Sequence, residues 1–585
     1  GLIEFRGDTD PFIKPILNIN GAKYQGELTW SKEQGWIPRF TGSFNKVLWE
    51  GIILTPENER GAFYRLKVIN NSSQEIDIKL GWQITWANTL QLIYNDHLLG
   101  CQNRVEHSTW TNTLGFEARG QTGLAALAFY LKDELFNQVK FDIKELTNGA
   151  GCHQVFIGTA GTVKPGEARQ IDLTMGLSVE IDGAHVTAIH MRRLGFNRCH
   201  AGTLGWLSKK SETVSASVVN AAKKAGELFR ESYDTGKLPS VVLKNLFFNY
   251  FYSNSKTIDS GDLVMLTSRS SRYYVSGAFW ARDAFLWSFP AILMIDKEKA
   301  LELLRAGFTK YAENGPFHSC YIDGALLYPG FELDELAAFF IALESYDQLY
   351  EDLPWQEPWI LEGARVLEKT LWQHHNPKHY LFSTMLDPSD DQVEYPYLTY
   401  SNVLTWRAIQ VLQRIYKSHN HNTHVRHLDG AERLLKKAIN QHCIFHGPFG
   451  SMYVWAADGE KGYQLYDNPP GSLQLLPHYG FCTMKDKIWL NTVKWIYSEH
   501  NPYAYLDTPI KGIGGVHAPY PWVLGACNSL LAGKVQEGLE LLLKSEMDNG
   551  YACETVKTTS GQLNTGAAFA PCGGFLAYSL VQAFK

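Results

Sequence analysis

The sequence lacks several patterns that would assign a function class directly. It has no apolar run near the ~20 residues that a membrane-spanning helix needs, no CxxC pair and no long basic run. A glycine-rich dinucleotide motif and a phosphate-binding loop between a strand and a helix are also absent. The formal net charge of -6 argues against nucleic acid as a partner. We therefore expect a protein that binds neither a membrane nor nucleic acid.

Cysteine is sparse and irregularly spaced. The 9 cysteines lie between Cys101 and Cys572, and neither their odd number nor their spacing defines a zinc site or a disulfide framework. The simplest interpretation is free buried thiols in a reducing, cytoplasmic compartment. The first residues, Gly1–Phe5, do not have the pattern of a signal peptide. Whether a leader once preceded them stays open.

Length and aromatic content are the first positive signals. The 585 residues exceed one compact core, so two or three domains are expected. Aromatic residues make up 13% of the chain, including 17 Trp and 29 Tyr. Flat aromatic faces often hold sugars, although aromatic side chains also fill cores.

Residues 1–205 show the two-residue alternation of strands. Phe63–Ile69 and Ile76–Leu80 alternate on either side of the turn Asn70–Ser73, and Ile171–Met175 is a further strand run. Such runs with no helix between them predict an antiparallel β-sandwich domain. This part carries no catalytic constellation, so we expect packing, or at most sugar contact, as its role.

The periodicity changes in the rest of the chain. Residues 206–240 are expected to form an amphipathic linker helix, because Val214, Val218 and Ala221 recur at helical spacing. Residues 241–585 are helical in period, with roughly a dozen segments that include Ala337–Leu349, Trp359–Leu371 and Val403–Ile415. Paired helices in that number predict an (α/α)6 barrel, a toroid in which the loops at one end build a pocket. This barrel would be the catalytic domain.

Glu554 is the first candidate for chemistry. It follows Tyr551-Ala552-Cys553 and precedes a loop rich in Gly, Thr and Ser and then an apolar helix. A carboxylate among small and apolar neighbours is poorly solvated, so its protonation can be tuned for base work. A helix-capping Glu near a turn is the alternative.

A second set of candidates lies in the segment Tyr274–Asp283. Trp280 offers a stacking face, while Arg282 and Asp283 offer an adjacent donor and acceptor that can hold two neighbouring hydroxyls of a sugar. A local Arg–Asp pair at a helix end would look the same. Further along, Phe331–Glu335 carries three carboxylates in four positions, which is more than helix capping needs.

The loop before residue 398 is the candidate acid. This loop has four carboxylates within eight residues, on Asp387, Asp390, Asp391 and Glu394. Their mutual repulsion raises the pKa of at least one of them if the loop is partly buried. A raised pKa is what a general acid needs. An exposed acidic turn is the alternative.

Two glycine- and proline-rich aromatic loops complete the candidates. Tyr466–Ser472 contains Asp467, and Gly512–Trp522 contains His517; either loop can line a pocket or simply connect two helices tightly. The histidine run at 419–427 is flanked by Asn, Lys and Arg, so we expect a solvated loop there and no metal.

In their order along the chain, these segments resemble the (α/α)6-barrel glycoside hydrolases. The greatest likeness is to the metal-independent α-mannosidases of glycoside hydrolase family 125, and family 63 and glucoamylase-type enzymes are more distantly similar. Phe279–Asp283 resembles the family's Trp-Leu-Arg-Asp segment, which binds the terminal sugar, and Pro388–Asp391 resembles its Pro-Ser-Asp-Asp loop, which supplies the general acid. Cys553–Thr555 stands where the family has His-Glu-Ser, whose Glu is the catalytic base.

Other segments resemble the family or depart from it. Asp467–Tyr479 and Gly512–His517 are similar to two further family loops. Cys553 replaces the family's His, and Asp387 replaces the Arg before its Pro-Ser-Asp-Asp loop. The expected β-domain is more typical of glucoamylase-type and phosphorylase relatives. An α-mannoside substrate therefore does not follow from the resemblance alone.

These observations and the resemblance together predict an inverting exo-glycoside hydrolase acting on α-linked, gluco- or manno-configured oligosaccharides or glycosides. Glu554 would be the base and Asp391 the acid, with Asp390 and Asp387 as reserves. The residues expected to hold the sugar are Trp280, Arg282, Asp283, Asp334, Asp387, Asp467 and His517. Water and two carboxylates suffice, so neither a metal nor an organic cofactor is expected. A phosphorylase of the same fold and a non-catalytic carbohydrate-binding protein are the alternatives. The sugar, its linkage and the oligomeric state stay open.

Overall fold

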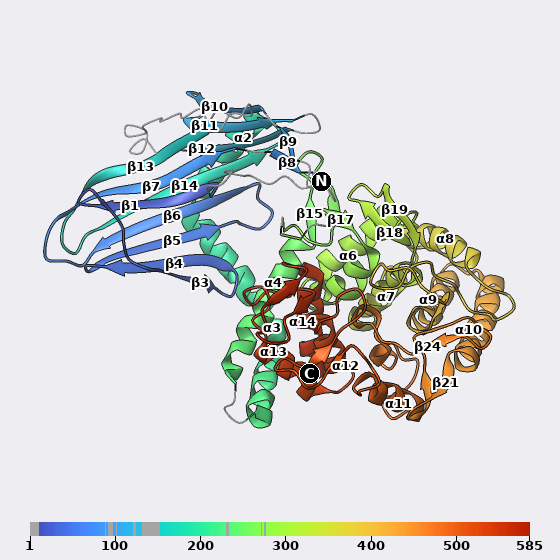
Figure 1. The fold of residues 1–585 in the computed structure, drawn as a ribbon. Coiled ribbons are helices and arrows are strands. Elements are labelled where there is room, and N and C mark those ends of the chain that lie inside the picture. Colours follow the sequence, from blue (N-terminus) through green and yellow to red (C-terminus); the bar gives the residue numbers. More distant parts are fainter. Residues whose placement is uncertain are drawn as a thin grey trace. The chain divides into compact units, whose positions relative to one another are not determined.

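The computed structural model describes most of the chain, in two compact units (Figure 1). The described residues are 11–87, 89–91, 98–100, 102–120, 124–130, 153–229, 233–270, 272–273 and 277–585. Gly1–Phe5, Tyr274–Ser276, Cys101 and Cys152 lie outside them. One unit contains Leu2–Lys209 and Thr257–Gly261, and the other Lys210–Lys256 and Asp262–Lys585. In the described part of the chain, no helix combines the length and apolar character needed to cross a bilayer.

The first unit is built on antiparallel sheets. Its strands are β1 (Ile13–Ile19), β2 (Ala22–Lys23), β3 (Leu28–Glu33), β4 (Ile37–Phe44), β5 (Val47–Leu54), β6 (Gly61–Asn70), β7 (Ile76–Trp86), β8 (Thr89–Gln91), β9 (Leu98–Gly100), β10 (Gln102–Ser108), β11 (Thr113–Arg119), β12 (Leu124–Tyr130), β13 (His153–Val163) and β14 (Ala168–Ser178). Eight strands pair in the order β10-β11-β12-β14-β6-β5-β4-β3, four in the order β13-β7-β1-β2, and β8 pairs with β9. The predicted strands Phe63–Ile69, Ile76–Leu80 and Ile171–Met175 are confirmed within β6, β7 and β14.

The two larger sheets share one hydrophobic core. Tyr64 of β6 and Trp82 of β7 come from different sheets, and their ring centroids lie 5.9 Å apart. Along β6 the side chains alternate between buried and half-buried, as the period of two requires. Burial of large aromatic and aliphatic side chains between the sheets is the main force that holds this unit together.

The expectation of strands up to residue 205 is wrong for its last part. Helix α2 (Ile181–Leu194) begins where the Glu180 side chain accepts a hydrogen bond from Gly183 N, and α3 (Phe196–Phe229) follows. Ala184 and Ala188 of α2 pack on alanines of β12, and a Cβ on Gly176 of β14 would lie 2.2 Å from Ala188 N. These small residues let the helix approach the sheet closely. The expected linker helix is therefore part of a longer helix, and residues 230–232 lie outside the described part.

The second unit is mainly helical. Its helices are η1 (Thr235–Lys237), α4 (Leu238–Tyr252), η2 (Arg282–Ser288), α5 (Phe289–Ile295), α6 (Lys297–Ala306), η3 (Gly307–Tyr311), α7 (Leu333–Tyr350), α8 (Pro358–Gln373), α9 (Thr399–Ser418), α10 (Asn422–His442), η4 (Pro469–Gly471), η5 (Leu473–Leu475), α11 (Lys487–Ile496), α12 (Val523–Leu531), α13 (Val535–Lys544) and α14 (Ala570–Ala583). The predicted helices Ala337–Leu349, Trp359–Leu371 and Val403–Ile415 are confirmed within α7, α8 and α9.

Short strands in the loops accompany these helices, and the sequence did not predict them. They are β15 (Asn254–Lys256), β16 (Leu263–Met265), β17 (Ala278–Phe279), β18 (Phe317–Tyr321), β19 (Leu326–Phe331), β20 (Tyr397–Leu398), β21 (Ile444–Gly447), β22 (Gly450–Tyr453), β23 (Ala456–Ala457), β24 (Tyr463–Gln464), β25 (Ala504–Tyr505), β26 (Gly512–Ile513), β27 (Thr555–Val556) and β28 (Leu563–Thr565). They form sheets of two or three strands, and most are too short to give a periodic signal.

Helix α14 lies inside this unit, packed against α4, α5, α12 and η2 (Figure 1). Nearly all its side chains from Ala570 to Val581 are buried, as expected for a helix that is apolar on every side. A Cβ on Gly574 would lie 2.5 Å from Asn249 Cγ of α4, so glycine permits the close approach of these helices. The loop that leads into α14 carries Glu554 and Phe569 and is thereby anchored at the centre of the unit.

Candidate active site

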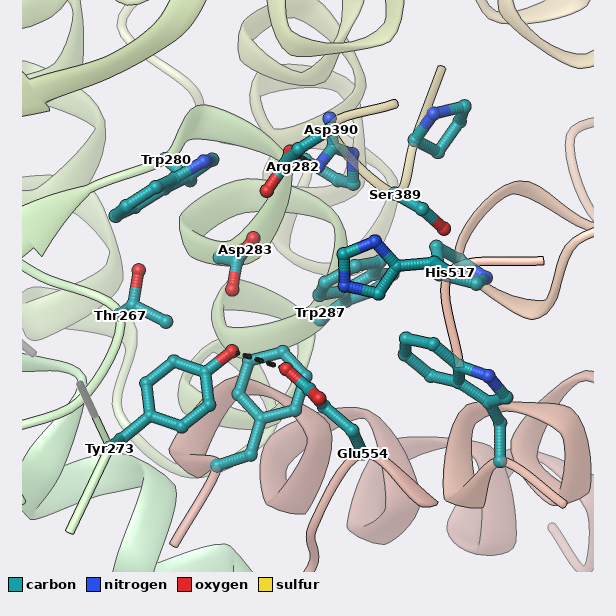
Figure 2. A pocket seen from close by; sticks show the side chains of 14 residues that line it. Thr267, Tyr273, Trp280, Arg282, Asp283, Trp287, Ser389, Asp390, His517 and Glu554 are labelled. Atoms are coloured by element: carbon teal, nitrogen blue, oxygen red, sulfur yellow. Dashed lines mark hydrogen bonds and ion pairs between the residues drawn. The ribbon is translucent and has the colours of Figure 1, made fainter. Parts of the chain in front are cut away.

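One pocket in the second unit brings together residues from distant parts of the sequence (Figure 2). Its lining residues are Thr267, Tyr273, Trp280, Arg282, Asp283, Trp287, Pro388, Ser389, Asp390, Pro470, His517, Trp522, Glu554 and Phe569. Six of the residues singled out from the sequence are therefore neighbours here. They are Trp280, Arg282, Asp283, Asp390, His517 and Glu554.

Glu554 is held in the pocket wall by its backbone and by one tyrosine. Its carbonyl accepts a hydrogen bond from Val523 N at 2.9 Å, and its Oε1 accepts one from Tyr273 Oη at 2.8 Å. Gly566 has φ 64°, and a Cβ there would lie 2.2 Å from Glu554 Cγ, so no side chain fits beside it. Burial raises the pKa of Glu554, while the Tyr273 hydroxyl lowers it. Such a weakly hydrated, oriented carboxylate is suited to accept a proton from water.

Aromatic rings form the wall around Glu554. Tyr273 stacks on Phe569 with ring centroids 5.1 Å apart and planes 8° from parallel, and Trp287 meets Phe569 edge-on at 5.9 Å. Trp522 lies beside His517 at 6.3 Å. These apolar faces exclude water and can stack on a sugar ring.

Arg282 is the centre of a buried ionic cluster next to the pocket. Its Nε donates to Asp334 Oδ2 at 2.7 Å, its Nη1 to Asp390 Oδ1 at 3.1 Å, and its Nη2 to Glu332. Nη2 also lies 3.4 Å from Glu335 Oε1, and the backbone N–H donates to Glu335 Oε2 at 2.6 Å. Asp334, Glu332 and Glu335 are completely buried. One guanidinium group thus faces four carboxylates.

The charge imbalance decides what this cluster can do. Burial opposes the charge on Arg282, but the four carboxylates hold its pKa above the usual value. Burial raises the pKa values of Glu332 and Glu335 well above normal, against the attraction of Arg282. Because four of the five guanidinium N–H bonds already face carboxylates, at most one remains for a ligand. The guanidinium group of Arg282 therefore contacts mainly carboxylates and has little left to bind a sugar hydroxyl.

The acidic residues 332–335 do not serve as helix caps. Glu332 precedes α7 at the capping position, yet its side chain makes no capping hydrogen bond. The Glu332 carboxylate pairs with Arg282 instead.

Asp283 is the neighbouring residue on η2, and its side chain lies in the pocket (Figure 2). It is 6% exposed. Burial raises its pKa well above the usual range, against the attraction of Arg282. A carboxyl group that keeps its proton can donate one hydrogen bond and accept others, which suits a sugar hydroxyl.

The candidate acid lies in a tight turn. Asp387 N donates to the Asp391 carbonyl at 2.7 Å, and Asp390 N donates to the Asp387 carbonyl at 2.9 Å. Asp387 Oδ1 accepts from Ser389 N at 2.8 Å and from Asp391 N at 3.3 Å. Burial raises the pKa of Asp387 to about 6. Asp390 adopts φ 68°, a left-handed backbone uncommon for a residue with a side chain and often found at functional sites.

The two aspartates of this turn have different surroundings. Asp390 lines the pocket and pairs with Arg282, whereas Asp391 is outside the lining set and its Oδ2 lies 3.3 Å from His517 Nδ1. The Asp391 side chain is 46% exposed, and Glu394 is exposed as well.

Three other predicted sugar-binding residues lie behind the pocket wall. Asp334 and Asp387 make the contacts described above. Asp467 is fully buried and accepts hydrogen bonds from Ser472 Oγ and Leu473 N, each at 2.8 Å. Burial raises its pKa to about 7. All three are outside the lining set, and their carboxylates bind other groups of the protein.

Sequence reasoning missed several lining residues, above all Tyr273, Thr267 and Ser389. Tyr273 lies in an irregular loop, and its partner Glu554 is 281 residues away. No local pattern marks such a pair. For Ser389 a signal existed, since it sits between Pro388 and Asp390 in the predicted acid loop.

The solvated loop expected at residues 419–427 is wrong for its second half, because His424 and His427 lie on α10. His424 Nε2 is 2.8 Å from Glu368 Oε1. Within the described residues, the group with suitable spacing for a metal ion is His318, Glu332 and Asp390. Arg282 already pairs with Glu332 and Asp390, so a cation placed there would meet the guanidinium charge.

Comparison with known sequences points to one enzyme family. Residues 364–580 match the family model of the metal-independent α-mannosidases, glycoside hydrolase family 125. The meiotically up-regulated gene 157 protein of Schizosaccharomyces pombe is 30% identical over 190 residues, which is 31% of this chain. The match spans 37% of the length of that curated relative.

Comparison with solved structures shows the same architecture at low identity. A metal-independent α-mannosidase from Streptococcus pneumoniae, solved with α-1,6-mannobiose, aligns with a TM-score of 0.55 at 15% identity, over 63% of this chain and 98% of its own. A bacterial glucoamylase complexed with acarbose aligns with a TM-score of 0.62 at 13% identity, over 98% of this chain and 88% of its own. A putative kojibiose phosphorylase from the human microbiome aligns with a TM-score of 0.51 at 12% identity, over 90% of this chain and 73% of its own.

These similarities confirm the resemblance inferred from the motifs and describe a mixed α/β fold with β-sheets in its N-terminal region. Residues 364–580 match the metal-independent α-mannosidases, and the solved structures share the fold of this chain at identities of 15% or less.

Proposed function

We propose that this protein is an inverting, exo-acting glycoside hydrolase for α-linked, gluco- or manno-configured sugars. One observation carries the proposal: Glu554 and Asp390 line the same aromatic-walled pocket, and Tyr273 orients the glutamate (Figure 2). The proposal includes a β-sandwich formed by strands β1–β14, followed by the helices α2 and α3 and by an (α/α)6 catalytic barrel at residues 241–585. A reducing, cytoplasmic location is supported by the free thiols of the seven described cysteines.

In this mechanism Glu554 removes a proton from water, and a carboxylic acid of the 387–391 turn protonates the departing glycosidic oxygen. An inverting enzyme needs the two carboxyl groups about 6.5–9.5 Å apart, on opposite faces of the sugar. Asp391 is the acid suggested by the motif. The pocket lining favours Asp390, because Asp390 is one of the lining residues and Asp391 is not. Asn substitution of each residue in turn separates the two assignments.

The pocket supports exo action on one terminal sugar. Its lining gathers flat ring faces and a few polar groups around one small cavity. Trp280 supplies a flat face, and Asp283 and His517 supply polar groups that can bind hydroxyls. Arg282, Asp334, Asp387 and Asp467 would act from behind by holding the loops in position.

The test is a screen of aryl α-glycosides and α-linked disaccharides, each with and without inorganic phosphate. The proposal predicts hydrolysis that needs neither phosphate nor a metal, with inversion of the product anomer followed by NMR. Phosphate-dependent turnover would establish a phosphorylase instead. Among the described lining residues, the one Lys or Arg side chain is Arg282, and its pairing with carboxylates leaves little for phosphate. Sugar binding without turnover would make the protein a non-catalytic carbohydrate binder.

A further inference from the structure

Ser389 is a polar residue of the pocket wall that the mechanism above does not use. It lies between Pro388 and Asp390, is 6% exposed, and lines the pocket. Figure 2 shows its side chain among those that line the pocket. Its backbone N–H is already satisfied by Asp387 Oδ1 at 2.8 Å. The side-chain hydroxyl of Ser389 is therefore the group that can contact a ligand.

The direction of the Ser389 hydroxyl is decided by Asn468. Asn468 Nδ2 lies 2.5 Å from Ser389 Oγ and 3.3 Å from Asp387 Oδ2, and the side chain is 1% exposed. An amide nitrogen carries hydrogens and no free lone pair, so Ser389 Oγ must accept this hydrogen bond. The hydroxyl hydrogen and one lone pair of Ser389 are then unused, and within the described residues no acceptor for that hydrogen is present.

Packing prevents Asn468 from turning away. A Cβ on Gly515 would lie 2.9 Å from Asn468 Oδ1 and 2.9 Å from the Tyr466 hydroxyl, so the 512–518 loop passes Asn468 in contact. Asn528 Nδ2 donates to the carbonyl of the next residue, Pro469, at 2.8 Å. The amide is thus fixed behind the pocket wall, with its donor group toward Ser389.

We propose that Ser389 is a substrate-binding residue whose hydroxyl donates a hydrogen bond to a neutral oxygen of the sugar, and that Asn468 is the positioning residue that orients it. The inference rests on the proposed function only in taking the ligand to be a sugar. The hydroxyl hydrogen of Ser389 has no acceptor among the described residues, so it can donate to a hydroxyl or glycosidic oxygen of the sugar.

The test is a double-mutant cycle on Ser389→Ala and Asn468→Ala, read as kcat/KM for the best aryl glycoside of the screen. Losing one neutral hydrogen bond to substrate lowers kcat/KM about 3- to 10-fold. Both substitutions remove the same oriented hydrogen. The kcat/KM of the double variant should therefore be within about 2-fold of that of the single variant with the lower kcat/KM. Losses that multiply, or a Ser389→Ala enzyme with wild-type kcat/KM, would overturn the proposal.

Asn402→Ala is the matched control, since Asn402 is also a fully buried amide and donates to the carbonyls of Phe382 and Leu398, each at 2.9 Å. It should lower Tm without lowering kcat/KM. If it lowers kcat/KM as Asn468→Ala does, a general loss of packing explains the result and the positioning role fails.

A pH profile separates orientation from packing. Asn468→Asp places a second carboxyl group beside Asp387, whose pKa is about 6. At pH 5 part of the molecules carry a proton on residue 468 that can be donated to Ser389, and as pH rises past the pair's titration this donor is lost. The activity of Asn468→Asp relative to wild type should therefore fall between pH 5 and pH 8, and this dependence should vanish in the Ser389→Ala background. A flat ratio, or a fall that persists in that background, contradicts the proposal.

Failure of the proposed function is distinguishable from failure of this inference. A wild-type protein that hydrolyses no glycoside refutes the function. The same variants are then compared by calorimetric titration with the sugar that binds best, where a Ser389→Ala protein with unchanged affinity refutes the inference.

Discussion

Replacing Tyr273 with Phe tests how the pocket tunes Glu554. The Tyr273 hydroxyl donates to Glu554 Oε1 at 2.8 Å and lowers the pKa that burial raises. Hydrogen bonds to charged groups contribute about 1.5–3 kcal/mol. Since 1.36 kcal/mol corresponds to one pKa unit, and the protonated glutamate keeps part of the interaction, we expect the pKa of Glu554 to rise by about 1 unit. A base with a higher pKa is protonated over a wider acidic range.

The assay is the pH dependence of kcat/KM, which reports the free enzyme. In Tyr273→Phe the acidic limb of the pH profile should move up by about 1 pH unit. The ring can still stack on Phe569, with centroids 5.1 Å apart, so Tm should stay close to wild type. Tyr416→Phe is the matched control, because Tyr416 also donates to a glutamate, Glu368, but outside the pocket lining. An acidic limb that stays in place or moves to lower pH in Tyr273→Phe would refute the reasoning.

Three further predictions follow from buried groups. Arg282→Met leaves several carboxylates without their cation and should lower the free energy of unfolding by about 3–5 kcal/mol in urea titrations; a loss below about 1 kcal/mol would contradict the cluster's role. Asp467 has its pKa raised to about 7, so its contribution to stability is lost as pH rises from about 4 through 7. Asp467→Asn should flatten that part of the Tm profile, and an unchanged slope would contradict this. Gly566→Ala should lower kcat at least tenfold, because its Cβ would lie 2.2 Å from Glu554 Cγ at φ 64°. Gly21→Ala, at φ 80° with open space around it, should cost stability only, and equal losses of kcat in both variants would exclude a local effect.

Regular periodicity made much of the fold predictable. The alternation of Phe63–Ile69 predicted β6, and the helical spacing of Ala337–Leu349 predicted α7. The sequence missed α2 because its buried face is built from alanine and methionine, which give a weak apolar signal. The short strands of the second unit depend on partners from other loops, so no local pattern foretold them.

Residues of the candidate site could be predicted where their neighbours in the sequence mark them. Glu554 and Asp283 were selected by their neighbours in the sequence, and the structure brings them into one pocket. The contacts that give them their properties are long-range: Arg282 meets Asp334 across 52 residues, and Tyr273 meets Glu554 across 281. A sequence alone does not state which of several carboxylates a guanidinium group will face. Asp467 was therefore expected at the sugar although it anchors a buried turn.

Glu554 is the catalytic base in the proposed mechanism, and the substitution Glu554→Gln tests this role. The substitution keeps the shape of the side chain and removes its ability to take a proton from water. We predict that turnover falls by at least about 10³-fold, in the range of lost general-base catalysis, while calorimetry still detects sugar binding at near wild-type affinity. A Glu554→Gln enzyme with near-normal kcat would contradict the account.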